Sequence, residues 1–245
     1  MGWRLVVLTG LLLGWGVAAA ADVRVAAAAN LNQALPAVVA AFEETHPGWR
    51  VGVSYAASGT LAEQILRGAP YDVFLSASPR YVDRVAEARG VVERRPFALG
   101  RLVVYLPRRL ELEPAGLEVL LDPRIRRVVL ANPAHAPYGE AAVAALEHAG
   151  LLEALEPRLV YASNVAQAAQ MVLHGADAGL IARSAALSPA MAKAGSFWTV
   201  PASLHPPLVQ EAALLTDGEA ARAFYAFLAS PAARQILRDR GFDLP

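Results

Sequence analysis

Four short segments of small, uncharged residues each stand between a predicted strand and the first turn of a predicted helix. They span residues 27–32, 55–61, 136–139 and 162–167, and they contain no Lys, Arg, Asp or Glu. The residues nearest the expected helix starts are Asn30, Ser58, Tyr138 and the pair Asn164–Val165. A helix N-terminus presents up to four unpaired backbone N–H groups and roughly half a positive charge. We therefore predict that these turns together bind an anion without any basic side chain.

A site built only of hydrogen-bond donors selects among anions by their state of protonation. Hydrogen phosphate keeps a proton near neutral pH and needs an acceptor for it, whereas sulfate, molybdate and tungstate are fully ionised. Because an unmade hydrogen bond of a buried group costs ~1–3 kcal/mol, the four segments favour a fully ionised tetrahedral oxyanion. The alternative is that Asn30 and Ser58 are only helix N-caps, each worth ~1 kcal/mol, and hold no ligand.

Enzyme and metal chemistry have weaker support in the sequence. Ser58, His135 and Asp72 are the residue types of a hydrolase triad, but the chain has no Gly-x-Ser-x-Gly elbow. The five histidines lack a His-Glu-x-x-His or other paired ligand spacing, and there is no cysteine to form a thiolate metal site or a disulfide. We expect no enzyme activity, no metal centre and no cofactor. An exported hydrolase remains the alternative from the enzyme class.

The composition limits the class of partner. Lys and Arg number 22, and Asp and Glu also number 22, so the formal net charge of the 245 residues is zero. The sequence has no basic run or stripe, and nucleic acid is therefore not an expected partner. Hydrophobic residues make up 56% of the chain, which is enough for one large core or two modest ones.

The N-terminal segment has the pattern of a secretory signal peptide. Arg4 precedes an apolar stretch at residues 5–17, which is followed by the small-residue cleavage pattern Ala19-Ala20-Ala21. The apolar stretch is shorter than the ~20 residues that a membrane span requires. We predict a signal peptide over residues 1–21, cleaved near Ala21, and a periplasmic mature protein.

Predicted strands and helices alternate in two series along the rest of the chain. The first series has strands at 23–28, 50–55 and 72–75, and Asn30, Ser58 and Ser78 are the expected N-caps of the helices between and after them. The second series has strands at 128–131, 159–161 and 177–182. Strict alternation of this kind predicts an α/β fold with parallel sheets covered by helices.

The chain crosses twice between the two series. One crossing is an apolar run at 97–106, predicted to be a single long strand, and the other is the proline-rich stretch 201–207 with the strand 208–216. We therefore predict two doubly wound lobes joined by a two-strand hinge, with a ligand cleft between them. The first lobe would comprise residues 22–103 and 206–245, and the second residues 104–205. The carboxyl ends of parallel strands, where ligands bind in such sheets, would then face one cleft.

Several motifs carry a resemblance to a known family. They are Ala27-Ala28-Ala29-Asn30-Leu31, Ala57-Ser58-Gly59-Thr60-Leu61-Ala62, Gly68-Ala69-Pro70-Tyr71-Asp72-Val73-Phe74-Leu75-Ser76-Ala77, Asn132-Pro133, Ala136-Pro137-Tyr138-Gly139, Asn164-Val165-Ala166-Gln167 and Ala176-Asp177-Ala178-Gly179-Leu180. In these segments, which cover essentially the whole mature chain in order, the sequence resembles the ModA family, the periplasmic molybdate-binding proteins of ABC importers. The resemblance implies a type II periplasmic-binding-protein fold.

The resemblance also implies how the ion is held. By position, Ser58 would donate through its hydroxyl and backbone N–H, Asn30 through its amide and backbone, and Tyr138 and Val165 through backbone N–H groups; Ala29 completes the predicted site. Many members carry a ligand-binding tyrosine at the position of Ala182, and the hydroxyl of Tyr138 would replace it here. Members with Asn in the first turn and Tyr in the third look like a sub-type of the family, and the chain resembles them.

For function, the resemblance implies capture of molybdate, and also tungstate, for an inner-membrane ABC permease by a monomeric protein. Sulfate or thiosulfate binding is the nearer alternative, because size selection depends on cavity dimensions that the sequence does not give. The effector domain of a transcription regulator is a further alternative, but the signal peptide and the lack of a helix-turn-helix segment argue against it.

Overall fold

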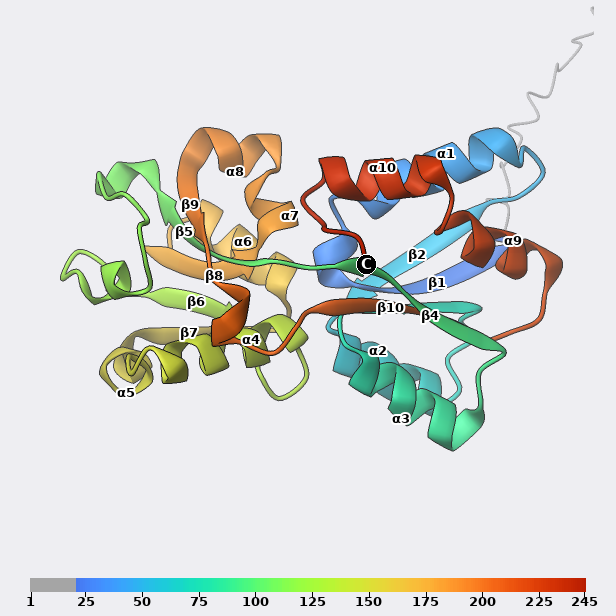
Figure 1. The fold of residues 1–245 in the computed structure, drawn as a ribbon, viewed down its shortest axis with the longest axis horizontal. Coiled ribbons are helices and arrows are strands. Elements are labelled where there is room, and N and C mark those ends of the chain that lie inside the picture. Colours follow the sequence, from blue (N-terminus) through green and yellow to red (C-terminus); the bar gives the residue numbers. More distant parts are fainter. Residues whose placement is uncertain (1–20) are drawn as a thin grey trace, which may run out of the picture.

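The protein has two α/β lobes that lie side by side, each built on a five-stranded sheet (Figure 1). The structure is a computed structural model and describes residues 21–245, so the predicted signal peptide lies outside the described residues except for Ala21. The strand order is β2-β1-β3-β10-β4 in the first sheet and β7-β6-β8-β5-β9 in the second. The predicted two-lobed α/β fold is confirmed.

The first lobe is built from both ends of the described chain. Its strands are β1 (Val23–Ala28), β2 (Val51–Ala56), β3 (Val73–Ser76), β4 (Glu93–Leu99) and β10 (Val209–Leu214). Its helices are the single 3₁₀ turn η1 (Ala29–Leu31), α1 (Leu35–Thr45), α2 (Ser58–Leu66), α3 (Pro79–Arg89), α9 (Glu219–Phe227) and α10 (Pro231–Asp239). As predicted, Ser78 is the N-cap residue of α3, and Pro79 occupies the first turn.

The second lobe is built from the middle of the chain. Its strands are β5 (Leu102–Pro107), β6 (Val128–Ala131), β7 (Leu159–Ala162), β8 (Ala178–Ala182) and β9 (Gly195–Thr199). Its helices are α4 (Pro137–His148), α5 (Leu152–Leu155), α6 (Val165–Leu173), α7 (Arg183–Ala186) and α8 (Pro189–Ala194). Short 3₁₀ turns lie at η2 (Arg108–Leu110), η3 (Glu118–Leu121), η4 (Glu156–Arg158) and η5 (Ala202–Leu204).

The first sheet is covered by helices on both faces, which explains why its inner strands β1 and β3 are almost entirely buried. Along β1, Val25 and Ala27 face the large core that also takes in α1, α9 and α10, and Ala26 faces the second cluster beneath α2 and α3. This alternation follows from the two-residue period of a strand. The sheet thus holds the starts of η1 and α2 at one edge, the carboxyl ends of β1 and β2.

One strand in each sheet runs against the predicted parallel direction. β1 is parallel to β2 and β3, and β6 is parallel to β7 and β8, as expected. β10 is antiparallel to β3 and β4, and β5 is antiparallel to β8 and β9. The reason is the crossing itself: β10 arrives from the second lobe and enters the first sheet at the carboxyl end of β3, so it must run back toward its start.

The apolar run at 97–106 is two strands and not the single strand predicted. β4 ends at Leu99 and β5 begins at Leu102, with Gly100 and Arg101 between them. The N–H of Gly100 donates to the backbone oxygen of Leu208, 2.8 Å away, which ties the two crossings together. A Cβ atom at position 100 would collide with the hydroxyl of Tyr138, so only glycine fits. The chain passes here from pairing with β10 in the first sheet to pairing with β8 and β9 in the second, and the local sequence pattern does not contain this change of partner.

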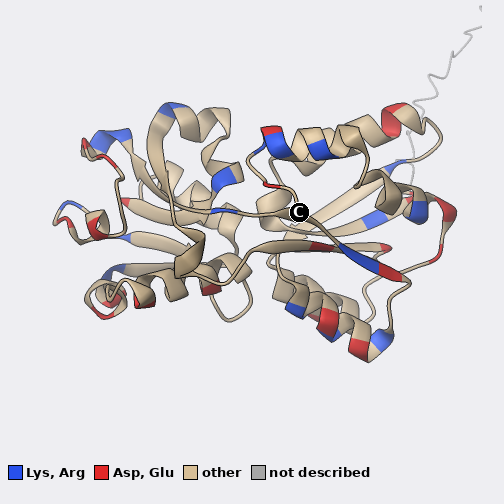
Figure 2. Cartoon of the chain, in the orientation of Figure 1, with Lys and Arg blue, Asp and Glu red and all other residues tan. Residues whose placement is uncertain are grey.

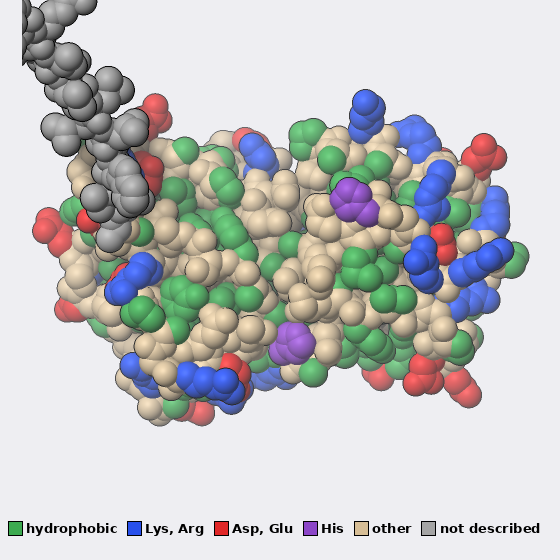
Figure 3. Space-filling model, turned by 180° about the vertical axis from the view of Figure 1, so that it is seen from behind, with side chains coloured by type: hydrophobic (Ala, Val, Ile, Leu, Met, Phe, Trp, Pro, Cys, Tyr) green, Lys and Arg blue, Asp and Glu red, His purple; other side chains and the backbone are tan. Residues whose placement is uncertain are grey.

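Charged side chains of both signs are spread over the two lobes (Figure 2). On the face seen in Figure 3, the middle of the molecule is mostly hydrophobic and uncharged, and the lysines and arginines lie mainly toward the ends. Within residues 21–245, no helix is both long and apolar enough to cross a bilayer. In the same range, no three His, Cys, Asp or Glu side chains are grouped as metal ligands would be.

Candidate anion site between the lobes

A small cavity lined mostly by buried residues lies where the two lobes meet. Its walls come from the ends of β1, β2, β3, β6 and β7 and the turns that follow them: Ala28, Ala29, Asn30, Ala57, Ser58, Ala77, Ala136, Pro137, Tyr138, Asn164 and Val165. The structure therefore brings all five predicted site residues to one place. Its volume is about 10 Å³, which is room for roughly one water molecule. A larger ion fits only if the lobes separate slightly.

Ser58 is the first residue of α2, and Ala57 is the N-cap, so the prediction that Ser58 caps this helix was wrong. Its hydroxyl oxygen instead accepts a hydrogen bond from the N–H of Ala77 at 3.0 Å. This bond crosses from α2 to the end of β3 and fixes the side chain, which is only 1% exposed. Because the N–H of Ala77 occupies the oxygen as acceptor, the hydroxyl proton is left to donate to an acceptor in the cavity.

Asn30 lies inside the turn η1, and α1 begins only at Leu35, so Asn30 is not the helix cap that the sequence predicted. The helix starts late because Pro36 is favoured in the first turn, where its missing N–H does no harm. The Asn30 side-chain nitrogen donates to Oε1 of Gln210 at 2.8 Å and approaches the Tyr138 hydroxyl at 3.5 Å. Its backbone oxygen accepts from the Ser184 hydroxyl of the second lobe at 2.8 Å.

Tyr138 is the second residue of α4, where a backbone N–H has no intrahelical acceptor. Its neighbour Gly139 packs so closely on Ala131 of β6 that a Cβ atom there would collide with the Ala131 carbonyl. The Tyr138 ring turns away from this N–H, and its hydroxyl reaches Asn30 and Gly100. Burial raises the pKa of Tyr138, and hydrogen bonds from Asn30 and from the Arg101 backbone offset this only in part. The hydroxyl therefore stays protonated.

Val165 is the first residue of α6, and Asn164 is its N-cap, as predicted. The Asn164 side-chain oxygen accepts from the backbone N–H of Gln167 at 2.9 Å. The N–H of Val165 lies in the first turn, where the helix provides no acceptor. The starts of α2, α4 and α6 thus meet at the cavity. All eleven lining residues of the described chain are uncharged, as the four sequence segments predicted.

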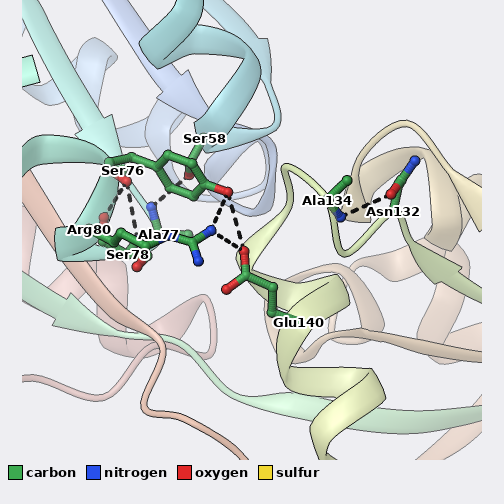
Figure 4. A network of polar contacts seen from close by, with 9 residues as sticks. Ser58, Ser76, Ala77, Ser78, Arg80, Asn132, Ala134 and Glu140 are labelled. Atoms are coloured by element: carbon green, nitrogen blue, oxygen red, sulfur yellow. Dashed lines mark hydrogen bonds and ion pairs between the residues drawn. The ribbon is translucent and has the colours of Figure 1, made fainter. Parts of the chain in front are cut away.

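Three polar contacts close the cleft beside the cavity. The N–H of Gly59 on α2 donates to the backbone oxygen of His135 at 2.9 Å. Figure 4 shows Glu140, on the first turn of α4, reaching across to α3. One carboxylate oxygen of Glu140 lies 2.5 Å from the Arg80 guanidinium and accepts from the Tyr81 hydroxyl at 3.2 Å. We call Arg80, Tyr81 and Glu140 the latch. Because each contact joins the two lobes, the structure is in a closed arrangement.

The residues of the hydrolase alternative do not form a triad. The Ser58 hydroxyl is paired with Ala77, and the His135 ring lies 3.1 Å from the backbone oxygen of Ser163. Asp72 pairs with Arg24, which contacts it through the side chain and the backbone, and with Thr216. Burial alone would raise the pKa of Asp72, but these hydrogen bonds outweigh it and hold the pKa below its usual value. The carboxylate is thus a structural group of the first lobe.

Sequence reasoning missed Gln210 and the latch. Gln210 is fully buried on β10, and its one readable signal is that it and Glu211 are long polar residues in a strand whose other residues are apolar. Arg80 and Glu140 had no signal beyond ordinary helix-surface charge. Ala182, where many members of the resembled family carry a tyrosine, is fully buried at the end of β8 and is not among the residues that line the cavity of the described chain.

Comparisons with known proteins agree with this arrangement. Residues 23–243 match the family model of the bacterial extracellular solute-binding proteins. The molybdate-binding protein ModA of Azotobacter vinelandii is 35% identical over 98% of this chain and 97% of its own length. ModA of Rhodobacter capsulatus is 34% identical over 96% of this chain and 94% of its own length.

The fold matches as well. The solved structure of the Azotobacter vinelandii periplasmic molybdate-binding protein superposes with a TM-score of 0.82 at 32% identity, covering 91% of this chain and all of that one. The family model and the two relatives each span nearly the whole described chain, so the match includes both lobes and the crossings between them. The chain therefore belongs to the bacterial extracellular solute-binding proteins and, within them, to the ModA family.

Proposed function

We propose that this protein captures molybdate, and tungstate of the same shape and charge, and delivers the ion to an ABC permease of the inner membrane. The observation that carries the proposal is the cavity between the lobes, which is lined by uncharged residues and bordered by the first turns of three helices. Proteins named for molybdate binding are its near relatives over the whole chain. The ligands would be the backbone and side-chain donors of Ala29, Asn30, Ser58, Tyr138 and Val165.

The mechanism follows from where the donors lie. Each of the three helix starts offers roughly half a positive charge, so together they offset most of a dianion's charge without a basic side chain. The hydroxyl proton of Ser58 and the N–H groups of Tyr138 and Val165 replace the ion's water shell as the lobes close. The latch then closes the entrance, and its solvent-exposed ion pair can open again to release the ion. No covalent step is involved, and we propose that the protein is not an enzyme.

We also propose that the protein acts in the periplasm, after removal of residues 1–21, and as a monomer. The family to which it belongs is extracellular, and the sequence of the first residues has the pattern of an export signal. The mature chain would need no metal or cofactor of its own. The partner permease would take the ion from the open form, since contacts such as the latch join the lobes in the closed one.

The test is ligand-dependent stability of the mature protein. Thermal unfolding is followed with molybdate, tungstate, sulfate and phosphate in turn. A ligand at about 100 times its dissociation constant stabilises the folded state by ~2.7 kcal/mol, and we expect a rise of roughly 5 °C or more in the midpoint with molybdate and tungstate. An equal rise with sulfate would make the protein a general oxyanion carrier. No rise with any of the four ions would refute the proposed function.

A further inference from the structure

The side chain of Gln210 is fully buried beside the proposed site but does not line it. It lies at the start of β10, where the pairing with β4 shifts register between Gln210 and Glu211. Such a bulge turns a side chain out of the regular strand pattern. The Gln210 side chain enters the space where the two crossings meet, and its nitrogen would lie 3.1 Å from a Cβ atom at Gly100. A polar residue held in this position calls for an explanation.

Its hydrogen bonds fix its own orientation first. The Gln210 nitrogen donates to the backbone oxygen of Leu208 at 2.9 Å, so the amide cannot turn over without setting two oxygens against each other. The Gln210 oxygen must then face Asn30, and it accepts from the Asn30 side-chain nitrogen at 2.8 Å. Gln210 therefore decides which way round the Asn30 amide lies.

The orientation of Asn30 matters because its two ends act oppositely on an anion. The nitrogen carries two N–H groups: one is used by Gln210, and the other has only the Tyr138 hydroxyl at 3.5 Å, the limit of a hydrogen bond. The Asn30 oxygen is buried and has no partner among the described residues. This second N–H is held only by the long contact to Tyr138, and we expect a bound oxyanion to accept from it. If the amide turned over, the oxygen would take the place of this N–H and would repel the ion.

We propose that Gln210 is a positioning residue, which holds the Asn30 amide so that an N–H and not the oxygen faces a bound oxyanion. This inference rests on the proposed function and names a residue that acts on the ion only through Asn30. It also explains why the unpaired Asn30 oxygen is tolerated although an unpaired buried acceptor is costly: the hydrogen bond that Asn30 donates to Gln210 fixes that orientation.

The test is a double-mutant cycle measured by isothermal titration with molybdate. The variants are Gln210→Met, Asn30→Ala and the two combined. The matched control is Gln235→Met, at an exposed position of α10. We expect Gln210→Met to bind molybdate about tenfold more weakly than the wild type, and to change affinity less than about twofold when Asn30 is already alanine. The Gln235→Met variant should bind as the wild type does.

Two results would overturn the inference while leaving the proposed function standing. One is wild-type affinity in Gln210→Met, and the other is an equal loss with and without the Asn30 amide, which would mean that Gln210 acts independently. Failure of the wild type itself to bind molybdate would instead overturn the proposed function, and the inference with it.

A second variant keeps the test open if Gln210→Met does not fold. A protonated glutamate has the shape of glutamine: its O–H can donate to Leu208, and its carbonyl can accept from Asn30. Burial raises the pKa of a glutamate, so Gln210→Glu should approach wild-type affinity as the pH falls from about 8.5 to about 5.5. The wild type measured at each pH is the reference. A constant ratio between the two proteins over this range would contradict the positioning role.

Discussion

Replacing Ser58 by alanine tests the site most directly, because one hydroxyl has two separable tasks. Its oxygen accepts from the N–H of Ala77, and its proton is the one that we expect to reach the ion. Loss of a hydrogen bond to a charged group costs ~1.5–3 kcal/mol, so the molybdate dissociation constant should rise by a factor of roughly 10–150. The unpaired Ala77 N–H should also lower the stability of the ligand-free protein by ~1–3 kcal/mol.

Ser76→Ala is the matched control. Ser76 is also fully buried at the end of β3, and its hydroxyl exchanges hydrogen bonds with the backbone of Ser78 at 2.7 and 3.1 Å without lining the cavity. Denaturant unfolding without ligand and isothermal titration with molybdate separate the two effects. Both variants should lose stability, and only Ser58→Ala should lose affinity. Equal affinity in Ser58→Ala and the wild type would refute the assignment of the cavity as the anion site.

Three further perturbations have expected outcomes. The variant Glu140→Gln, in which the latch is weakened, should release molybdate about two- to fivefold faster in stopped-flow experiments, because an exposed ion pair is worth ~0.2–1 kcal/mol. The control Glu63→Gln, which breaks an ion pair inside the first lobe, should release molybdate at the wild-type rate. Gly100→Ala should weaken molybdate binding at least ~10-fold in titration, because the new Cβ collides with the Tyr138 hydroxyl in the closed form; unchanged affinity would show that closure does not bring them together. Asp72→Asn should lower the unfolding free energy by ~1 kcal/mol at neutral pH. Since the folded pKa of Asp72 is depressed, this stabilisation is present above the usual Asp pKa of about 3.9 and lost as the pH falls through the folded pKa, so the two proteins should converge in acid.

The pairing of arginines near the cavity helps to explain why no basic side chain takes part in binding the dianion. The nearest arginines are already paired: Arg101 and Arg183 both bind the carboxylate of Asp243, at 2.5 and 2.7 Å. Burial would raise the pKa of Asp243, but the hydrogen bonds from these two arginines hold it below the usual range. Both guanidinium groups thus have their carboxylate partner outside the cavity, and the group of three keeps one positive charge.

The sequence by itself determined the local structure and most of the site's wall. Alternation of apolar strands with capped helices was enough to predict the two lobes, since strand and helix periods depend on neighbouring residues only. Asn164 could be predicted to be a cap because asparagine favours that position. Its side chain does accept a hydrogen bond from the backbone three residues further on. The charge-free segments around Ser58 and Tyr138 can be read directly from the sequence. A parallel α/β sheet places such turns at one edge, which predicts that they meet.

Only the tertiary structure decided the contacts between distant parts of the chain. The sequence predicts that Ser58 is a helix cap, but its hydroxyl oxygen accepts a hydrogen bond from the N–H of Ala77, which follows the next strand. The partner of Asn30 is Gln210, separated from it by 180 positions in the sequence. Position 100 requires glycine because a tyrosine of the other lobe occupies the space for a side chain. These features depend on how the lobes close on one another, and no local hydrogen-bonding or periodicity rule contains that information.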